Sequence, residues 1–133
     1  MPPVLEKSLL DRCALRFAEE PKLVAVWIFG SALAERLRDD SDIDLALYYQ
    51  PGGRPDCAAL ADLAMDLEDV FQRRVDLGLL GSRNLIYAAQ AVRTGRLIYA
   101  PDEAAAIALS SRILTLYLDL KRDRKPVEEA YCA

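Results

Sequence analysis

The residues best suited to chemistry in this chain are Gly30-Ser31 and the Asp42-Ile43-Asp44 segment that follows them. An apolar run ends at Gly30, and ten residues separate Ser31 from Asp42. Residues i and i+2 of a strand point to the same face, so Asp42 and Asp44 are expected to stand side by side. Two adjacent carboxylates repel each other unless a cation lies between them. The spacing therefore predicts a small backbone turn that faces a paired-carboxylate metal site.

A third aspartate, Asp76, extends this prediction. It lies inside the apolar segment 74–80, where an ionised side chain costs several kcal/mol unless it is paired. If this segment forms a strand beside the strand of Asp44, the three carboxylates share one pocket and can hold two Mg²⁺ ions. In two-metal sites the ions lie roughly 3.5–4 Å apart and stabilise the attacking and leaving oxygens together. Mg²⁺ prefers carboxylates plus substrate phosphates, so a bound triphosphate would complete its ligands.

The Gly30-Ser31 turn is suited to the other half of such a site. Gly30 has no side chain to block the approach of a phosphate. The Ser31 hydroxyl and the amides at the start of a following helix can donate hydrogen bonds to phosphate oxygens. Because the chain contains no histidine, Ser-His and Cys-His pairs and histidine-ligated metals are excluded. A carboxylate is therefore the expected proton acceptor.

The composition indicates one compact domain. The chain has 133 residues, of which 53% are hydrophobic, and a net charge of −4 that disfavours direct binding of nucleic acid. Its cysteines, Cys13, Cys57 and Cys132, are too far apart to indicate a disulfide framework or a zinc site. No apolar stretch approaches the roughly 20 residues that cross a membrane, and the N-terminal residues lack the order of a signal peptide. A cytoplasmic protein with no membrane contact is expected.

Hydrophobic periodicity and turn residues predict alternating helices and strands. Helices are expected over about 4–19, 31–37, 57–72, 83–94 and 102–124, and strands over 23–29, 43–49, 74–80 and 96–99. This order predicts an α/β (α+β) domain over residues 1–125, with a small mixed sheet flanked by helices, and a short flexible tail over 126–133. Leu15, Cys13 and Cys57 are expected in the core. The last helix has more apolar residues than one buried face needs.

At Gly30-Ser31, Asp42, Asp44 and residues 75–77 the chain resembles the nucleotidyltransferase superfamily of DNA polymerase beta and the kanamycin nucleotidyltransferases. The superfamily pattern is a glycine followed by Gly or Ser, then Asp-x-Asp, then a later aspartate on a strand. The short length and the segment 93–99 resemble the minimal nucleotidyltransferase (MNT) branch. This resemblance implies the polymerase beta-like nucleotidyltransferase fold.

The resemblance also implies a function and a set of roles. Many MNT proteins are antitoxins encoded beside a HEPN toxin, which is an RNase. Transfer of AMP from ATP to a tyrosine hydroxyl of a cognate HEPN toxin, which neutralises the toxin, is therefore implied. Asp42 and Asp44 would bind both Mg²⁺ ions, and Asp76 would bind the catalytic ion and help to deprotonate the incoming hydroxyl. Gly30 and Ser31 would hold the triphosphate of ATP.

Two other functions stay open. An antitoxin that neutralises its toxin by binding alone is suggested by the apolar last helix and the acidic charge balance. A small-molecule nucleotidyltransferase of the antibiotic-modifying kind is the other alternative. Those enzymes generally carry extra structure that recognises the substrate, and this chain lacks such structure unless it dimerises.

Overall fold

The computed structural model of the protein describes residues 6–29, 42–81 and 84–132, with side chains described as far as Asp123. The helix expected over 31–37 lies outside these residues. The elements are, in order, α1 (Lys7–Phe17), β1 (Leu23–Phe29), β2 (Ile43–Tyr49), α2 (Cys57–Phe71), β3 (Val75–Leu79), α3 (Leu85–Thr94), β4 (Arg96–Tyr99) and α4 (Glu103–Cys132). The helices and strands predicted for the described residues are confirmed, with small shifts at their ends, except that α4 extends well beyond its predicted end.

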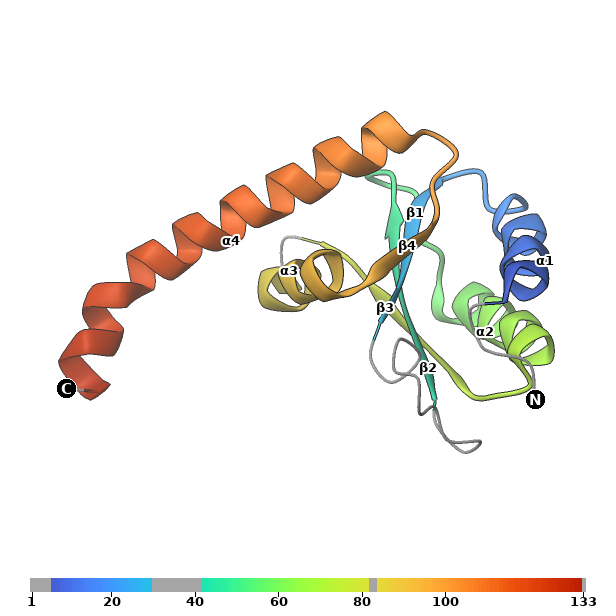
Figure 1. Ribbon diagram of the computed structural model, residues 1–133, viewed down its shortest axis with the longest axis horizontal. Coiled ribbons are helices and arrows are strands. Elements are labelled where there is room, and N and C mark those ends of the chain that lie inside the picture. The colour runs from blue at the N-terminus through green and yellow to red at the C-terminus, as the bar shows by residue number, and fades with distance from the viewer. Residues whose placement is uncertain (1–5, 30–41, 82–83, 133) are drawn as a thin grey trace.

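The strands form one mixed sheet in the order β3-β2-β1-β4 (Figure 1). β1 pairs antiparallel with both β2 and β4, whereas β2 and β3 are parallel. Parallel neighbours need a crossover connection, and α2 supplies it. The Asp56 side chain caps the start of α2, because it accepts a hydrogen bond from Ala59 N at 2.8 Å. The expected small mixed sheet flanked by helices is therefore confirmed.

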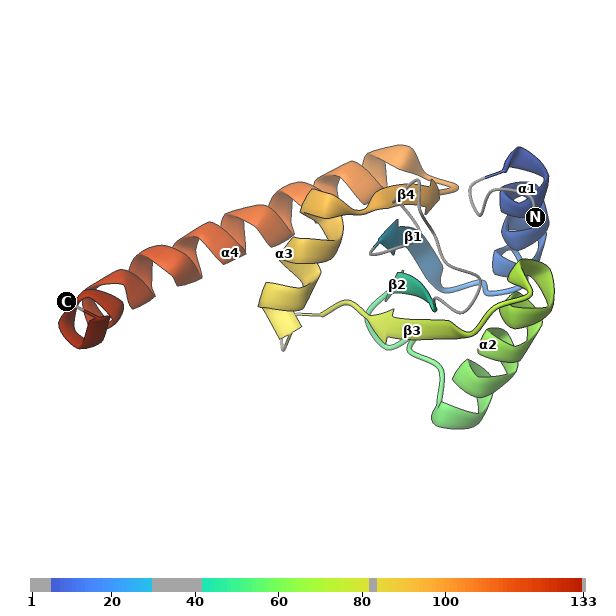
Figure 2. The same cartoon turned by 60° about the horizontal axis from the view of Figure 1, so that its bottom comes forward.

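Helices cover both faces of the sheet. Figure 2 shows the sheet between α1 and α2 on one side and α3 and α4 on the other. The core on the α1/α2 face is made of large side chains such as Phe17, Leu45 and Leu67. The core on the α3/α4 face contains many alanines, including Ala25, Ala46 and the α3 residues Ala88, Ala89 and Ala91. Because these side chains are small, α3 packs close to the strands.

Gly95 makes the connection from α3 to β4 tight. Its φ of −84° is ordinary, so a left-handed conformation is not what requires glycine here. A Cβ at this position would overlap the carbonyl oxygen of Ala91 and would lie 3.1 Å from the carbonyl oxygen of Ile28. The missing side chain lets the chain turn directly from the end of α3 into β4 beside β1.

Two expectations about the core were wrong. Leu15 is 74% exposed, because Cys13 and Phe17 are four residues apart and face the sheet, whereas Leu15 lies between them on the opposite side of α1. Cys57 is exposed as the first residue of α2, while Cys13 is buried. An apolar residue near a helix end does not reach the core when its angular position faces outward.

α4 is longer than the sequence predicts. It continues through Pro126 to Cys132, beyond the expected end near residue 124, and it runs out from the sheet past α3 (Figure 1). Ala106 and Ile113 are buried against the body, whereas Ile107 and Leu118 are 63% and 62% exposed. One apolar face of α4 is therefore packed and a second is open to solvent. None of the described helices combines the length and the hydropathy needed to span a membrane.

The two described thiols are expected to differ in reactivity. Burial raises the pKa of Cys13 to about 11, so little thiolate is present at neutral pH, and the side chain is also inaccessible. Iodoacetamide should alkylate exposed Cys57 at least about tenfold faster than Cys13 in the folded protein. Timed alkylation followed by peptide mass spectrometry measures both rates. Similar rates in the folded protein would contradict the burial of Cys13, and in urea both thiols should react.

Candidate active site

Phe29, Asp44 and Asp76 form a row across three neighbouring strands. The strand register pairs Phe29 of β1 with Asp44 of β2, and Asp44 with Asp76 of β3. Register partners point to the same face of a sheet. The next row on this face contains Trp27, Ala46 and Gly78, which α3 and α4 cover. The carboxylates therefore stand at the open end of the α3/α4 face, and the predicted adjacency of the Asp44 and Asp76 strands is confirmed.

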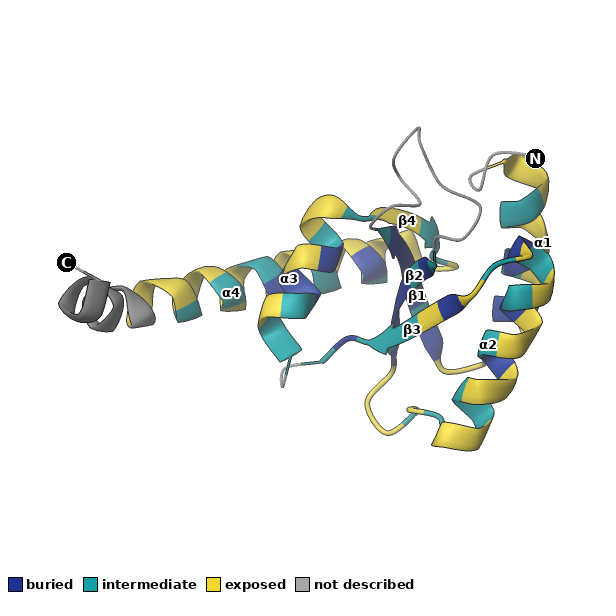
Figure 3. Cartoon of the chain, turned by 90° about the horizontal axis from the view of Figure 1, so that it is seen from below, coloured by how far each residue is buried: buried dark blue, intermediate teal, exposed yellow. Residues whose placement is uncertain are grey.

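The two carboxylates differ in their exposure to solvent. Asp44 is partly buried, as is Asp42 just before β2, whereas Asp76 is exposed. The sequence predicts a buried Asp76 because its neighbours are apolar. The structure differs because β3 is an edge strand of the sheet, and Figure 3 shows exposed residues within it. Asp76 can therefore meet an incoming group directly from solvent.

The charges at this site repel each other. Burial raises the pKa of Asp44 above its ordinary value, and the negative charges of Asp76 and Asp42 raise it further. A cation between these carboxylates would remove the repulsion, and their hard oxygen donors suit Mg²⁺. In the part of the chain that the structure describes, no group of three or more His, Cys, Asp or Glu side chains is arranged to hold a metal ion. The metal-binding role of Asp42, Asp44 and Asp76 therefore stays a prediction.

An open cavity of about 520 Å³ lies beside the carboxylates. Its lining residues are Phe29, Asp44, Asp76, Leu77, Gly78, Asn84 and Tyr87. The volume is sufficient for a small ligand such as a nucleotide. Gly30 and Ser31 follow Phe29 in the chain but lie outside the described residues, so their predicted role in holding phosphates is untested.

Five lining residues were not anticipated as parts of the site: Phe29, Leu77, Gly78, Asn84 and Tyr87. Phe29 packs against the core of the α3/α4 face, lines the cavity and contacts the Tyr87 ring edge-on, with 5.7 Å between the ring centroids. Asn84 accepts a hydrogen bond from Gly81 N at 3.0 Å and donates one to Leu79 O at 2.7 Å. Gly78 was a usable signal, because glycine within a strand often marks the close approach of another group.

A second cavity, of about 300 Å³, lies at the other end of β2. Its lining includes Tyr48, Leu80 and Ile113, together with Arg54 and Arg112, and none of its lining residues is acidic. The Arg54 guanidinium donates a hydrogen bond to the carbonyl oxygen of Leu80 at 3.2 Å. This cavity therefore lacks the carboxylates that the sequence predicts for the site, which lie at the first cavity.

Known structures share this fold. A structure of the toxin–antitoxin pair MntA–HepT matches with a TM-score of 0.72 and 21% identity, covering 96% of this chain and 100% of the other. A toxin–antitoxin structure with AMP-PNP matches with a TM-score of 0.74 and 23% identity, covering 93% and 98%. A tri-AMPylated Shewanella oneidensis HEPN toxin in complex with MNT antitoxin matches with a TM-score of 0.72 and 21% identity, covering 97% and 100%.

Sequence comparison identifies the family. No curated protein matches the chain. The family model described as polymerase beta, nucleotidyltransferase matches residues 12–104, a range that includes all five predicted site residues and ends just after β4. This range covers most of the chain and contains the whole sheet with the row of Asp44 and Asp76. The chain therefore belongs to the polymerase beta nucleotidyltransferase family.

Proposed function

We propose that the protein is an antitoxin that transfers AMP from ATP to a tyrosine hydroxyl of a cognate HEPN toxin and thereby neutralises it. The observation that carries this proposal is the pairing of Asp44 with Asp76 beside an open cavity, within a nucleotidyltransferase family fold. The shared fold of the antitoxin complexes supports the choice of partner, and one of those toxins is tri-AMPylated. A reaction that consumes ATP would place the protein in the cytoplasm.

The proposed reaction divides the roles among a few residues. Asp42 and Asp44 would hold two Mg²⁺ ions, and Gly30 and Ser31 would hold the triphosphate. When bound, the ions neutralise the triphosphate and stabilise the attacking and leaving oxygens. The acceptor oxygen forms a bond to the α-phosphorus as the bond to pyrophosphate breaks. Asp76 is exposed beside the cavity, where it would bind the catalytic ion and help to deprotonate the incoming hydroxyl.

Labelled ATP, Mg²⁺ and the toxin encoded beside the gene test this proposal. The toxin should gain the mass of one or more AMP groups. The double variant Asp42→Ala/Asp44→Ala should lower the transfer rate by about 10³-fold or more, because it removes the charge that holds the metal ions. The matched control Asp62→Ala/Asp69→Ala removes two exposed carboxylates from α2 and should transfer AMP normally. Neutralisation of the toxin without a mass shift would contradict the enzymatic function.

The open apolar face of α4 favours a second candidate, neutralisation by binding alone. Ile107 and Leu118 are exposed on a helix that extends from the body of the protein. Exposed apolar patches of this kind often mark contacts with another protein. If cells that carry the Asp42→Ala/Asp44→Ala variant still survive the toxin, binding is sufficient. Loss of protection by this variant, with normal protection by the α2 control, supports catalysis.

A further inference from the structure

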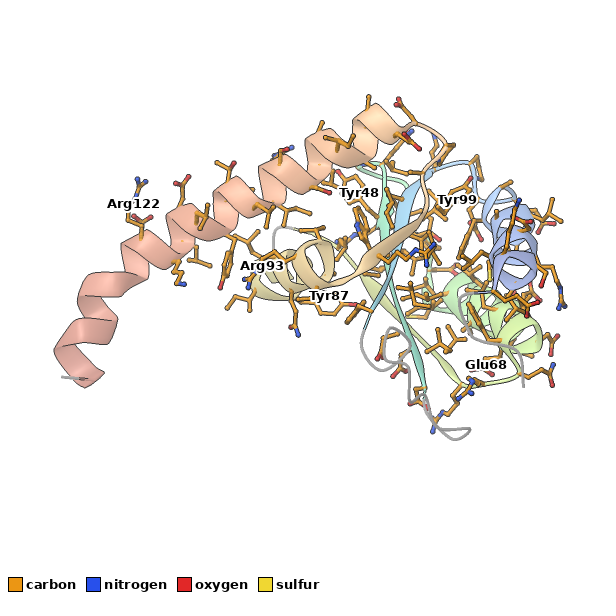
Figure 4. All side chains as sticks on the ribbon, viewed as in Figure 1. Tyr48, Glu68, Tyr87, Arg93, Tyr99 and Arg122 are labelled. Carbon is orange, nitrogen blue, oxygen red and sulfur yellow. The ribbon has the colours of Figure 1, made fainter. Side chains whose placement is uncertain are left out.

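Tyr87 projects from α3 onto β3 beside the candidate site (Figure 4). A Cβ added to Gly78 would overlap the hydroxyl oxygen and Cζ of Tyr87, so the phenol occupies the space that a side chain at Gly78 would take. Gly78 and Ala46 are register partners, and both are small. The edge-on contact with Phe29 fixes the ring from the other side. The position of the hydroxyl is therefore set by the backbone of β3.

The hydroxyl lies close to where a ligand of the carboxylates would extend. Gly78 follows Asp76 by two residues on β3, so the two positions share one face and are about 6–7 Å apart along the strand. Tyr87 lines the same cavity as Asp44 and Asp76. The phosphate chain of a nucleotide bound at Asp44 and Asp76 is therefore long enough to reach the Tyr87 hydroxyl.

The hydroxyl is also available as a donor. Burial, together with the negative charges of Asp44 and Asp76, raises the pKa of Tyr87 to about 12, so the phenol stays protonated at neutral pH. Within the described part of the chain, its hydroxyl makes no hydrogen bond. The amide of Asn84, the other neutral polar side chain in the lining, is already bonded to the backbone of Leu79 and Gly81. Among the described lining side chains, Tyr87 is thus the one free donor.

We infer that the Tyr87 hydroxyl donates a hydrogen bond to a phosphate oxygen of the nucleotide bound at Asp44 and Asp76. Gly78 makes this contact possible by leaving room for the ring. A hydrogen bond to an anionic oxygen is stronger than one to a neutral acceptor, and the carboxylates that share the cavity would themselves be engaged by the cations. The inference rests on the proposed function only in requiring that a nucleotide binds at this site.

Calorimetry with AMP-PNP and Mg²⁺ tests the contact without turnover. Tyr87→Phe keeps the ring and removes the donor, and it should raise the Kd for AMP-PNP about tenfold, as expected for one hydrogen bond to a charged group. Adenosine has no phosphate, so its affinity should not change. The control Tyr99→Phe keeps the contact with Phe17, at 5.3 Å between centroids, and should bind AMP-PNP like the wild type.

A second variant, Gly78→Ala, tests whether the position of the Tyr87 ring matters as well as its hydroxyl group. Gly78→Ala should displace Tyr87 and also weaken AMP-PNP binding. The same substitution in a Tyr87→Ala background should add little, because the clash has been removed. Wild-type affinity for AMP-PNP in Tyr87→Phe, with the toxin still AMPylated, would overturn this inference alone. If Tyr87→Phe weakens AMP-PNP binding but the wild-type protein never modifies a toxin, only the proposed function is overturned. If the wild-type protein does not bind AMP-PNP, both the inference and the proposed function are overturned.

Discussion

Asp44→Asn is expected to make the metal-free protein more stable and, at the same time, to lower nucleotide transfer by about 10³-fold. Asp44 is partly buried and faces Asp76, and burial together with the charges of Asp76 and Asp42 raises its pKa. The ionised Asp44 side chain is therefore less favourable in the folded protein than in the unfolded chain, and this lowers the free energy of unfolding. Asparagine has nearly the same shape without the charge, so it relieves the repulsion and loses the ability to hold a cation.

Thermal unfolding in EDTA measures the first effect of this substitution. The midpoint of Asp44→Asn should exceed that of the wild type, whereas Asp62→Asn, which removes an exposed charge on α2, should leave it nearly unchanged. Because the folded protein raises the pKa of Asp44 above its ordinary 3.8, the folded state binds the proton more tightly than the unfolded state. The advantage of the variant should therefore be complete above the raised pKa and should narrow as the pH falls through it toward 3.8.

Mg²⁺ should reverse the difference in thermal stability, so that the wild type unfolds at a higher temperature than Asp44→Asn. If Asp44 helps to hold the ion, Mg²⁺ raises the midpoint of the wild type and has little effect on Asp44→Asn. A variant that is less stable than the wild type without metal, or that retains full transfer activity, would contradict the role given to Asp44. A rise in stability without loss of transfer would place the metal-binding carboxylates elsewhere.

Leu45→Ala is expected to lower the free energy of unfolding by roughly 2–5 kcal/mol, a large share of the roughly 5–15 kcal/mol typical of a domain. Leu45 is 0% exposed in central strand β2 and belongs to the core beneath α1 and α2. The same substitution at Leu15, which is 74% exposed on α1, should change the free energy by no more than about 0.5 kcal/mol. Urea unfolding measures both values. Equal effects at the two positions would contradict the orientation of α1.

Much of the fold follows from local patterns in the sequence. The nearly continuous apolar run of β1 predicts a strand covered on both faces, and helices do cover both faces of the sheet that contains it. Asp56 before an amphipathic segment predicts the start of α2, where its side chain caps the helix. The alternation of Asp42 and Asp44 also predicts a shared face. These features depend on neighbours along the chain, which is why residue order alone is sufficient to predict them.

The sequence by itself determined which residue types are available for chemistry: three aspartates on or beside predicted strands, an adjacent Gly-Ser pair and no histidine. Only the tertiary structure decided which of them meet. The parallel register of β2 and β3 places Asp76 opposite Asp44, and the edge position of β3 leaves Asp76 exposed. The packing of α3 brings Tyr87 over Gly78. Such contacts join residues that are distant in the chain, so they depend on the order of strands and the placement of helices.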